Sequence, residues 1–309
     1  IKVVPAHRLG KAKRLDDARD RYEDFCLSTL PKHFTLAGKK IILDCAHGAT
    51  YQVAPSIFSR LGADIQIINN QPNGLNINEN AGSIHPEFLI KAVLIAKADL
   101  GIAFDGDGDR LIMVDELGQL IDGDQILFLL LKSYLQQNIM SGGLVGTLMS
   151  NLALEEKCKE MNIPFTRAKV GDKYVAEALR EKKWIIGGEN SGHIVLLDKH
   201  STGDGIISSL QLIAFLQSNQ ESLSQALSNF PMYPQKLINI TSIGKFNADG
   251  DEVKPLIEQA NEMMEGKGRV LIRESGTQPL IRVMTEGPDV ERVIESAQFL
   301  VDSINQTSQ

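Results

Sequence analysis

The chain has 309 residues, of which 43% are hydrophobic, and its formal net charge is −7. This composition is sufficient for buried cores, gives no basic excess that would indicate a nucleic-acid partner, and includes no run of about 18 apolar residues that would span a membrane. Three scattered cysteines (Cys26, Cys45 and Cys158) exclude a disulfide framework and a cysteine-based zinc site. With no recognisable signal peptide, the sequence predicts a cytoplasmic protein.

The first part of the chain alternates between two hydrophobic patterns. Short apolar runs bounded by turn residues indicate strands, and apolar residues at the helical period indicate helices. The expected helices are 15–30, 53–61, 86–98 and 122–136, and the expected strands are 41–45, 65–68, 100–104 and 111–114. Strands that alternate with helices at this spacing predict βαβ units.

The middle of the chain repeats this alternation. The expected strands are 144–147, 165–169, 185–187 and 194–197, and the expected helices are 151–161, 172–183, 205–216 and 223–227. A Gly-Asp pair occurs before an apolar helix in residues 121–126 and again in residues 202–206. Repeated local order predicts two copies of one fold, although two unrelated capped helices would produce the same resemblance.

The last part of the chain follows a proline-rich boundary at residues 230–234. Its expected strands are 236–240, 269–273 and 280–284, and its expected helices are 253–264 and 290–304. The predicted fold class is therefore α/β, with two consecutive mixed α/β domains of similar topology followed by a smaller α+β C-terminal domain. The predicted domains are residues 1–140, 141–231 and 232–309.

The strongest chemical motif is Asp105-Gly106-Asp107-Gly108-Asp109-Arg110, between two predicted strands. Glycine tolerates a tight bend, so the alternate carboxylates can converge on one point. Three hard oxygen donors suit Mg²⁺, and Arg110 adds a planar charged group that suits phosphate. The sequence therefore predicts that Asp105, Asp107 and Asp109 bind a divalent metal.

Two other interpretations apply to this motif. Asp-Gly is typical of a plain hairpin turn, which explains one such pair but not two pairs and a third aspartate. In a Ca²⁺-binding EF-hand, the three aspartates would stand at the first, third and fifth loop positions and Glu116 at the twelfth. The sixth position should then be glycine, but Arg110 occupies it.

A second polar loop, residues 187–193, lies between two predicted strands. Glu189, Asn190 and Ser191 offer adjacent acceptors and donors, a mixture that suits sugar hydroxyls. His193 could position a phosphate or a hydroxyl, or could be a structural residue at the start of the strand. A polar hairpin turn without a ligand would have the same composition.

A third loop, residues 273–279, joins two strands in the last domain. Ser275 and Thr277 flank Gly276, so hydroxyl and backbone N–H groups can face one anion. Arg273 and Arg282 can add bidentate phosphate contacts, although an ordinary turn with surface arginines is the alternative. A metal loop, a hydroxyl-binding loop and a phosphate-binding loop in three domains together indicate a phosphosugar bound in a cleft.

These three loops, in this order, resemble the α-D-phosphohexomutase family. Within the family, residues 147–151 and 168–172 are most similar to bacterial members that act on glucosamine phosphates. The resemblance implies four domains, three of them with a common α/β topology. It also implies a phosphoserine in the first domain that interconverts glucosamine 6-phosphate and glucosamine 1-phosphate, for UDP-N-acetylglucosamine and peptidoglycan synthesis.

The resemblance also implies roles for individual residues. One Mg²⁺ would lie beside the phosphoserine, and Arg110 would belong to the catalytic region. The intermediate would be glucosamine 1,6-bisphosphate, and the full-length protein could form a homodimer. The implied metal ligands are Asp105, Asp107 and Asp109, and the implied substrate-binding residues are Gly171, Asp172, Glu189, Asn190, Ser191, His193, Arg273, Ser275, Gly276, Thr277 and Arg282.

Two features depart from the family pattern. Gln278 stands where the family usually has glutamate, and the Thr-x-Ser-His-Asn-Pro motif that carries the family phosphoserine does not occur in residues 1–309. Since the chain starts at Ile1, we expect it to correspond to domains two to four and to be inactive alone. The alternatives are a family member acting on glucose or mannose phosphates and a non-catalytic phosphosugar-binding protein.

Overall fold

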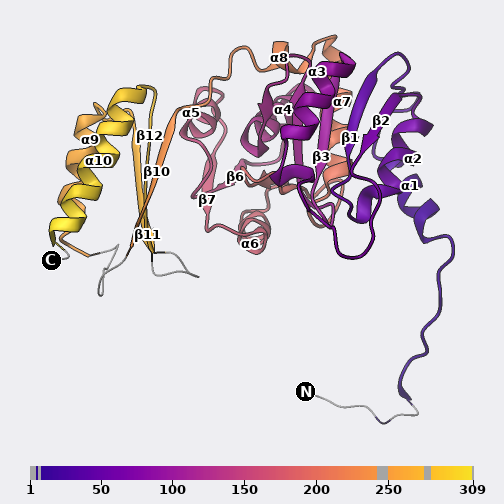
Figure 1. The fold of residues 1–309 in the computed structure, drawn as a ribbon, viewed down its shortest axis with the longest axis horizontal. Helices are drawn as coiled ribbons and strands as arrows, with labels where there is room; N and C mark the ends of the chain where they lie inside the picture. The colour runs from indigo at the N-terminus through magenta and orange to yellow at the C-terminus, as the bar shows by residue number, and fades with distance from the viewer. Residues whose placement is uncertain (1–4, 6–7, 242–249, 275–279, 308–309) are drawn as a thin grey trace.

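The computed structural model describes residues 5, 8–241, 250–274 and 280–307. Figure 1 shows two sheet-containing units side by side and a third unit at the C-terminal end of the chain. Within the described ranges, no helix combines the length and the apolar character needed to cross a bilayer.

The first unit is built on a five-stranded sheet in the order β2-β1-β3-β4-β5. Its strands are β1 (Lys40–Asp44), β2 (Asp64–Ile68), β3 (Leu100–Phe104), β4 (Leu111–Asp115) and β5 (Leu120–Ile121). β1 is parallel to β2 and β3, whereas β4 is antiparallel to β3 and β5. α1 (Ala18–Ser28) precedes the sheet, and the connecting helices are η2 (Ala49–Tyr51), α2 (Val53–Arg60), η3 (Gly82–Ile84) and α3 (Glu87–Ala96).

The second unit has a four-stranded sheet in the order β7-β6-β8-β9. Its elements are β6 (Leu144–Thr147), α5 (Leu152–Glu160), β7 (Phe165–Ala168), α6 (Asp172–Lys182), β8 (Ile186–Gly188) and β9 (Ile194–Leu196). As in the first unit, the first strand lies between two parallel partners, and the fourth strand is antiparallel to the third. This confirms the predicted repeat, and it places residues 105–110 and 189–193 at equivalent hairpins.

Two helices exchange partners between these units. α4 (Gly123–Gln136) follows the first sheet in the chain but contacts β8 and α5 of the second unit. α7 (Gly205–Asn219) follows the second sheet and contacts β3 and β4 of the first sheet as well as β9 of its own. The two helices also contact each other. Apolar side chains from both units therefore form one continuous buried cluster, which explains why both helices are apolar on nearly all sides.

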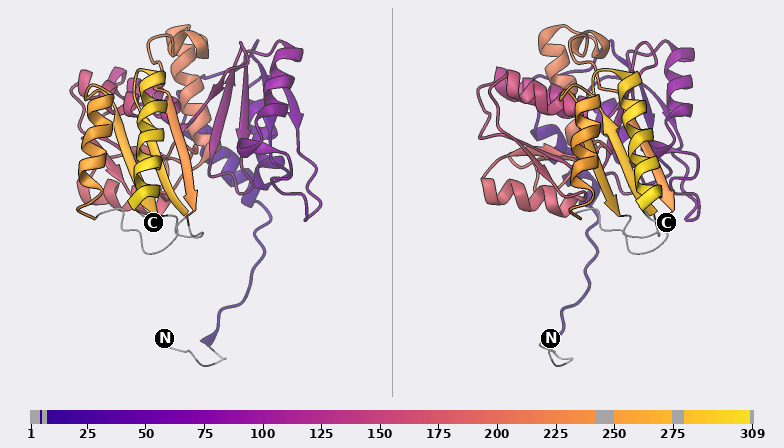
Figure 2. Two further views of the ribbon diagram at one scale, coloured as in Figure 1. Left: turned by 60° about the vertical axis from the view of Figure 1, so that its left-hand side comes forward. Right: turned by 90° about the vertical axis from the view of Figure 1, so that its left-hand side faces the viewer.

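The third unit is a three-stranded antiparallel sheet in the order β10-β12-β11. Its elements are β10 (Gln235–Thr241), α9 (Lys254–Met263), β11 (Arg269–Glu274), β12 (Leu280–Glu286) and α10 (Val290–Thr307), and the short α8 (Leu223–Ala226) precedes it. α9 and α10 cover one face of this sheet (Figure 2). Ile240, Ile272 and Val283 bury their side chains beneath these helices, forming a separate core.

Arg269 anchors this sheet to the second unit. Its Nη1 donates a hydrogen bond to the carbonyl of Leu148 at 2.8 Å, and its Nη2 donates to the carbonyl of Ser150 at 3.1 Å. Its Nε donates to Oε1 of the fully buried Glu286 at 2.6 Å. The guanidinium thus joins two units while it neutralises a carboxylate that water cannot reach.

Asp124, near the start of α4, is a buried carboxyl group in the same region. Its Oδ2 accepts a hydrogen bond from the backbone N–H of Asn151 at 2.7 Å, while Oδ1 has no partner among the described residues. Burial, and then the nearby Asp122 carboxylate, raise the pKa of Asp124 to about 8. The folded protein therefore retains a proton that an unfolded aspartate has already released at neutral pH.

This pKa predicts a dependence of stability on pH. Because the folded-state pKa lies above the unfolded value of about 3.9, the folded state binds more protons between about pH 4 and pH 8, and its stability should fall as the pH rises through that range. Replacing Asp124 with asparagine should reduce this decline. Urea unfolding of the unmodified protein and of Asp124→Asn at pH 5 and pH 8 measures the decline in stability of each. Equal declines in the two proteins would assign the effect to other groups.

Candidate functional site

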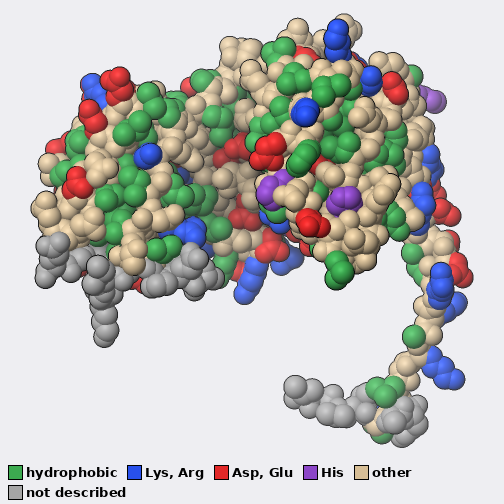
Figure 3. Space-filling model, viewed as in Figure 1, with side chains coloured by type: hydrophobic (Ala, Val, Ile, Leu, Met, Phe, Trp, Pro, Cys, Tyr) green, Lys and Arg blue, Asp and Glu red, His purple; other side chains and the backbone are tan. Residues whose placement is uncertain are grey.

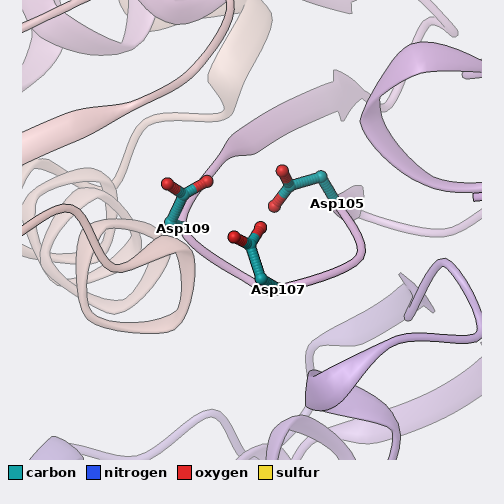
Figure 4. A group of neighbouring side chains, drawn as sticks. All are labelled: Asp105, Asp107 and Asp109. Atoms are coloured by element: carbon teal, nitrogen blue, oxygen red, sulfur yellow. The ribbon is translucent and has the colours of Figure 1, made fainter. Parts of the chain in front are cut away.

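The predicted metal loop joins β3 to β4 as a tight hairpin. Gly108 has a φ of +81°, in the left-handed region that favours glycine. Carboxylate oxygens of Asp105, Asp107 and Asp109 all lie within 4.8 Å of one another. Figure 4 shows the three side chains directed toward a common point inside the loop. Three convergent carboxylates are a donor set that fits Mg²⁺.

Asp105 is the buried member of the three. It accepts hydrogen bonds from the backbone N–H groups of Gly108 and Arg110, each at 3.1 Å, and from Nε of Arg110 at 2.6 Å. Burial favours the protonated acid, but the hydrogen bonds from Arg110 outweigh it and hold the pKa of Asp105 below its usual value. Asp105 is therefore ionised and also stabilises the turn.

In contrast to Asp105, Asp109 has a pKa above its usual value. Burial raises its pKa, and the carboxylates of Asp105 and Asp107 raise it further, although His193 partly offsets them. The three charges therefore repel one another in the loop. A bound divalent cation would relieve this repulsion, which is the second reason that the residues fit such an ion.

The EF-hand interpretation is wrong for this loop. The loop is flanked by two strands rather than two helices, and Glu116, which would be the twelfth ligand, accepts hydrogen bonds from the hydroxyls of Ser222 and Ser224.

The predicted sugar loop packs directly against the metal loop. The N–H of Leu111 donates to the carbonyl of Gly192 at 2.9 Å, and Arg110 and His193 form an antiparallel bridge. Nδ1 of His193 lies 3.0 Å from Oδ2 of Asp109. A Cβ atom at Gly192 would lie 2.1 Å from the carbonyl oxygen of Leu111, so only glycine permits this approach. Two loops that are about 80 residues apart in sequence thus lie in direct contact.

The start of each of the helices α4 and α7 donates a hydrogen bond to the loop of the other unit. The N–H of Gly123, at the start of α4, donates to the carbonyl of Asn190, and the N–H of Gly205, at the start of α7, donates to the carbonyl of Gly108, each at 3.0 Å. Asp122 and Asp204 cap the two helices. The Gly-Asp repeat noted in the sequence lies at these two helix starts, but the equivalent supporting residues are Asp122-Gly123 and Asp204-Gly205, and their contacts with the loops were not predicted.

Glu189 lies nearly buried in the second loop, where its Oε1 accepts a hydrogen bond from the N–H of Gly171 at 2.8 Å. Gly171 has a φ of +127°, a backbone conformation that residues other than glycine rarely adopt. Asp172 is exposed at the first turn of α6, and Ser191 is exposed beside the partly buried Asn190. The structure thus brings Gly171 and Glu189 together and leaves Ser191 free to contact a ligand.

Arg273 on β11 and Arg282 on β12 are cross-strand partners. Burial and the neighbouring Arg282 both lower the pKa of Arg273, and Nε of Arg282 is buried without a hydrogen-bond partner among the described residues. Two adjacent guanidinium groups that lack a described carboxylate partner suit an anion. The predicted phosphate-binding residues Ser275, Gly276 and Thr277 lie outside the described residues.

Three family models match consecutive parts of the chain. The phosphoglucomutase/phosphomannomutase alpha/beta/alpha domain II matches residues 21–118, domain III matches residues 122–233, and the C-terminal domain matches residues 234–303.

Curated relatives are similar over most of the chain. The phosphoglucosamine mutase of Methylobacillus flagellatus is 51% identical over 305 residues, which cover 97% of this chain and 67% of the relative. The phosphoglucosamine mutase of Haemophilus ducreyi is 50% identical over 302 residues, with 97% and 68% covered. The chain thus spans about two thirds of the length of these relatives.

Solved structures share the fold at lower identity. A phosphoglucomutase/phosphomannomutase family protein from Burkholderia thailandensis has a TM-score of 0.75 at 20% identity, covering 93% of this chain and 64% of that chain. The N-acetylphosphoglucosamine mutase of Aspergillus fumigatus, solved with GlcNAc-6P and magnesium, has a TM-score of 0.74 at 20% identity, covering 93% and 70%.

Proposed function

Because the chain belongs to the phosphoglucomutase/phosphomannomutase family of α-D-phosphohexomutases, we propose that it forms the metal-, sugar- and phosphate-binding regions of a phosphoglucosamine mutase. The reaction is the interconversion of glucosamine 6-phosphate and glucosamine 1-phosphate. The observation that carries the proposal is the joining of the metal loop to the sugar loop through Asp109 and His193. Similarity of about 50% to curated phosphoglucosamine mutases supports this choice of sugar.

Asp105, Asp107 and Asp109 would hold one Mg²⁺. When bound, the ion would neutralise the charge of a phosphoryl group during its transfer. Arg110, whose Nε is held by Asp105, leaves its remaining guanidinium nitrogens to bind phosphate oxygens. His193 acts as a positioning residue, because its ring nitrogen orients the Asp109 carboxylate.

Glu189 and Ser191 would bind sugar hydroxyls, with Asn190 and Asp172 at the edge of the same surface. Glu189 suits this role because the N–H of Gly171 fixes one of its oxygens and leaves the other to accept a hydrogen bond from the sugar. A carboxylate whose position is fixed in advance loses less conformational entropy when the ligand binds. This favours selective binding of one sugar orientation.

Arg273 and Arg282 would bind the phosphate that is not reacting, together with Ser275, Gly276 and Thr277. One phosphate at these arginines and one at the metal loop would hold the two ends of a glucosamine 1,6-bisphosphate intermediate. Reversal of the sugar between the two sites would then bring the other phosphate to the metal loop. Its phosphoryl group would pass to the serine that the family carries in its first domain, leaving the isomeric monophosphate.

Calorimetry of residues 1–309 with sugar phosphates tests this proposal. In the presence of Mg²⁺, glucosamine 6-phosphate should bind more tightly than glucose 6-phosphate or mannose 6-phosphate, because the site should recognise the amino substituent. Preferential binding of glucose 6-phosphate or mannose 6-phosphate would indicate another member of the family, and no binding of any of the three would exclude the proposal.

Replacing Arg273 with lysine should weaken glucosamine 6-phosphate binding by about tenfold, because lysine keeps the charge but loses the bidentate geometry. Calorimetry measures the change. Arg14→Lys is the matched control, since the Arg14 side chain is 91% exposed in the N-terminal segment and its replacement should change nothing. Equal affinities of the Arg273→Lys and unmodified proteins would remove Arg273 from the phosphate site.

A further inference from the structure

A cavity lies at the far end of α7 from the metal loop. It has a volume of about 380 Å³, and its walls include Leu100, at the start of β3, and Leu216, in the last turns of α7. The metal loop instead follows the end of β3 and contacts the first residue of α7. Since a helix of 15 residues is about 22 Å long, the cavity is separate from the candidate active site.

The inner wall of this cavity is apolar. Its apolar lining residues are all at most 5% exposed, and they are Leu36, Leu100, Ile213, Leu216 and Leu223. A space of this size and lining can bury the apolar part of a small molecule.

The polar lining has an excess of negative charge. Asp99, Glu116 and Glu221 contribute carboxylates, while Lys39 is the only cationic side chain among the described lining residues and already lies 3.4 Å from Asp99. Glu116 and Glu221 therefore have no cationic partner in the described part of the cavity.

Glu116 lines the cavity as a partly buried carboxylate that is hydrogen-bonded through only one of its two oxygens. Its Oε1 accepts the hydroxyl hydrogen bonds of Ser222 and Ser224, and its Oε2 is buried with no hydrogen-bond partner among the described residues. Burial disfavours the charged form, but the two serine hydrogen bonds outweigh it and lower the pKa of Glu116. A partly buried carboxylate without a cationic partner is unfavourable, so a cation that approaches Glu116 from the cavity would be stabilised here.

The end of α7 adds to this negative potential. The helix ends at Asn219, and Gln220 reverses the chain with a φ of +56°. The last carbonyl groups of a helix carry a partial negative charge that favours cations. The carboxylates and the end of the helix thus independently favour a positively charged ligand.

We propose that this cavity binds a small amphipathic cation, with its apolar part among the leucines and its protonated amine or guanidinium group at Glu116. The proposal does not rest on the mutase assignment, because none of the residues that carry it belongs to the metal, sugar or phosphate loops.

Binding of 2-phenylethylammonium to residues 1–309 tests the proposal, with neutral 2-phenylethanol as the matched probe. Calorimetry without Mg²⁺ or sugar phosphate should show that the ammonium binds at least about tenfold more tightly than the alcohol. Methyl NMR should place the largest shifts at Ile213, Leu216 and Leu223. Equal affinities of the two probes, or shifts confined to other parts of the chain, would overturn the proposal.

Glu116→Gln should weaken ammonium binding by about tenfold, because the amide still accepts the serine hydrogen bonds but has no charge. Glu160→Gln is the matched control, since Glu160 is 61% exposed on α5, and it should bind the ammonium as the unmodified protein does. If Glu116→Gln fails to fold, Glu221→Gln, at an exposed residue of the rim, should still weaken binding at least about twofold. Unchanged affinity in the variant that folds would count against a cation site.

Discussion

Replacing Asp107 with alanine should weaken Mg²⁺ binding by more than about 100-fold. Replacing a residue that hydrogen-bonds to a metal ligand already lowers metal affinity by about 10- to 100-fold, and loss of a ligand itself should lower the affinity further. Asp107 is the exposed member of the three aspartates, whereas Asp105 also stabilises the turn through Gly108 and Arg110. The variant should therefore lose the metal and keep the fold, which calorimetry with Mg²⁺ and circular dichroism measure.

Asp251→Ala provides the matched control for this prediction. Its side chain is 95% exposed and pairs only weakly with Lys254 on the surface, so its replacement should leave Mg²⁺ affinity unchanged. Retention of the original affinity in Asp107→Ala would show that the convergent carboxylates are not the metal site.

Replacing Arg269 with methionine should lower the free energy of unfolding by about 3–5 kcal/mol, because it leaves the buried charge of Glu286 without its partner. Glu286 is fully buried, and within the described residues it forms an ion pair with Arg269. The same change removes the hydrogen bonds to the carbonyls of Leu148 and Ser150. Urea unfolding, followed by circular dichroism, measures the loss.

The double variant Arg269→Met, Glu286→Gln separates the two causes. It has no buried charge, so it should regain a large part of the lost stability, while the hydrogen bonds to the second unit stay absent. If the double variant is no more stable than Arg269→Met, the contacts with Leu148 and Ser150, rather than the ion pair, account for the loss. A single variant as stable as the unmodified protein would contradict the predicted role of Arg269.

Secondary structure was predictable from the sequence because it depends on local pattern. The helix expected at 205–216 is α7, which continues to Asn219, and the strand expected at 100–104 is β3. β5 was missed because its two residues, Leu120 and Ile121, are too few to show a period. The convergence of the three aspartates was also local, since alternating glycines allow one short loop to bring the carboxylates together.

The family assignment also followed from sequence, because each of the three motifs is short and continuous. The roles of Arg273, Glu189 and the other substrate-binding residues stay predictions. Residues 275–279, which lie outside the described structure, contain three of the predicted phosphate contacts.

Only the tertiary structure decided how these motifs are combined. The contact of His193 with Asp109, the hydrogen bonds from Gly123 and Gly205, and the packing of α4 and α7 on each other's sheets join residues that are far apart in the chain. No local pattern encodes such pairs, because they form only when apolar surfaces from both units are buried together. The same burial raises the pKa of Asp124 and leaves Glu116 with an unpartnered oxygen. The sequence thus determined which chemical groups are present, and burial in the folded chain determined their charge states and their neighbours.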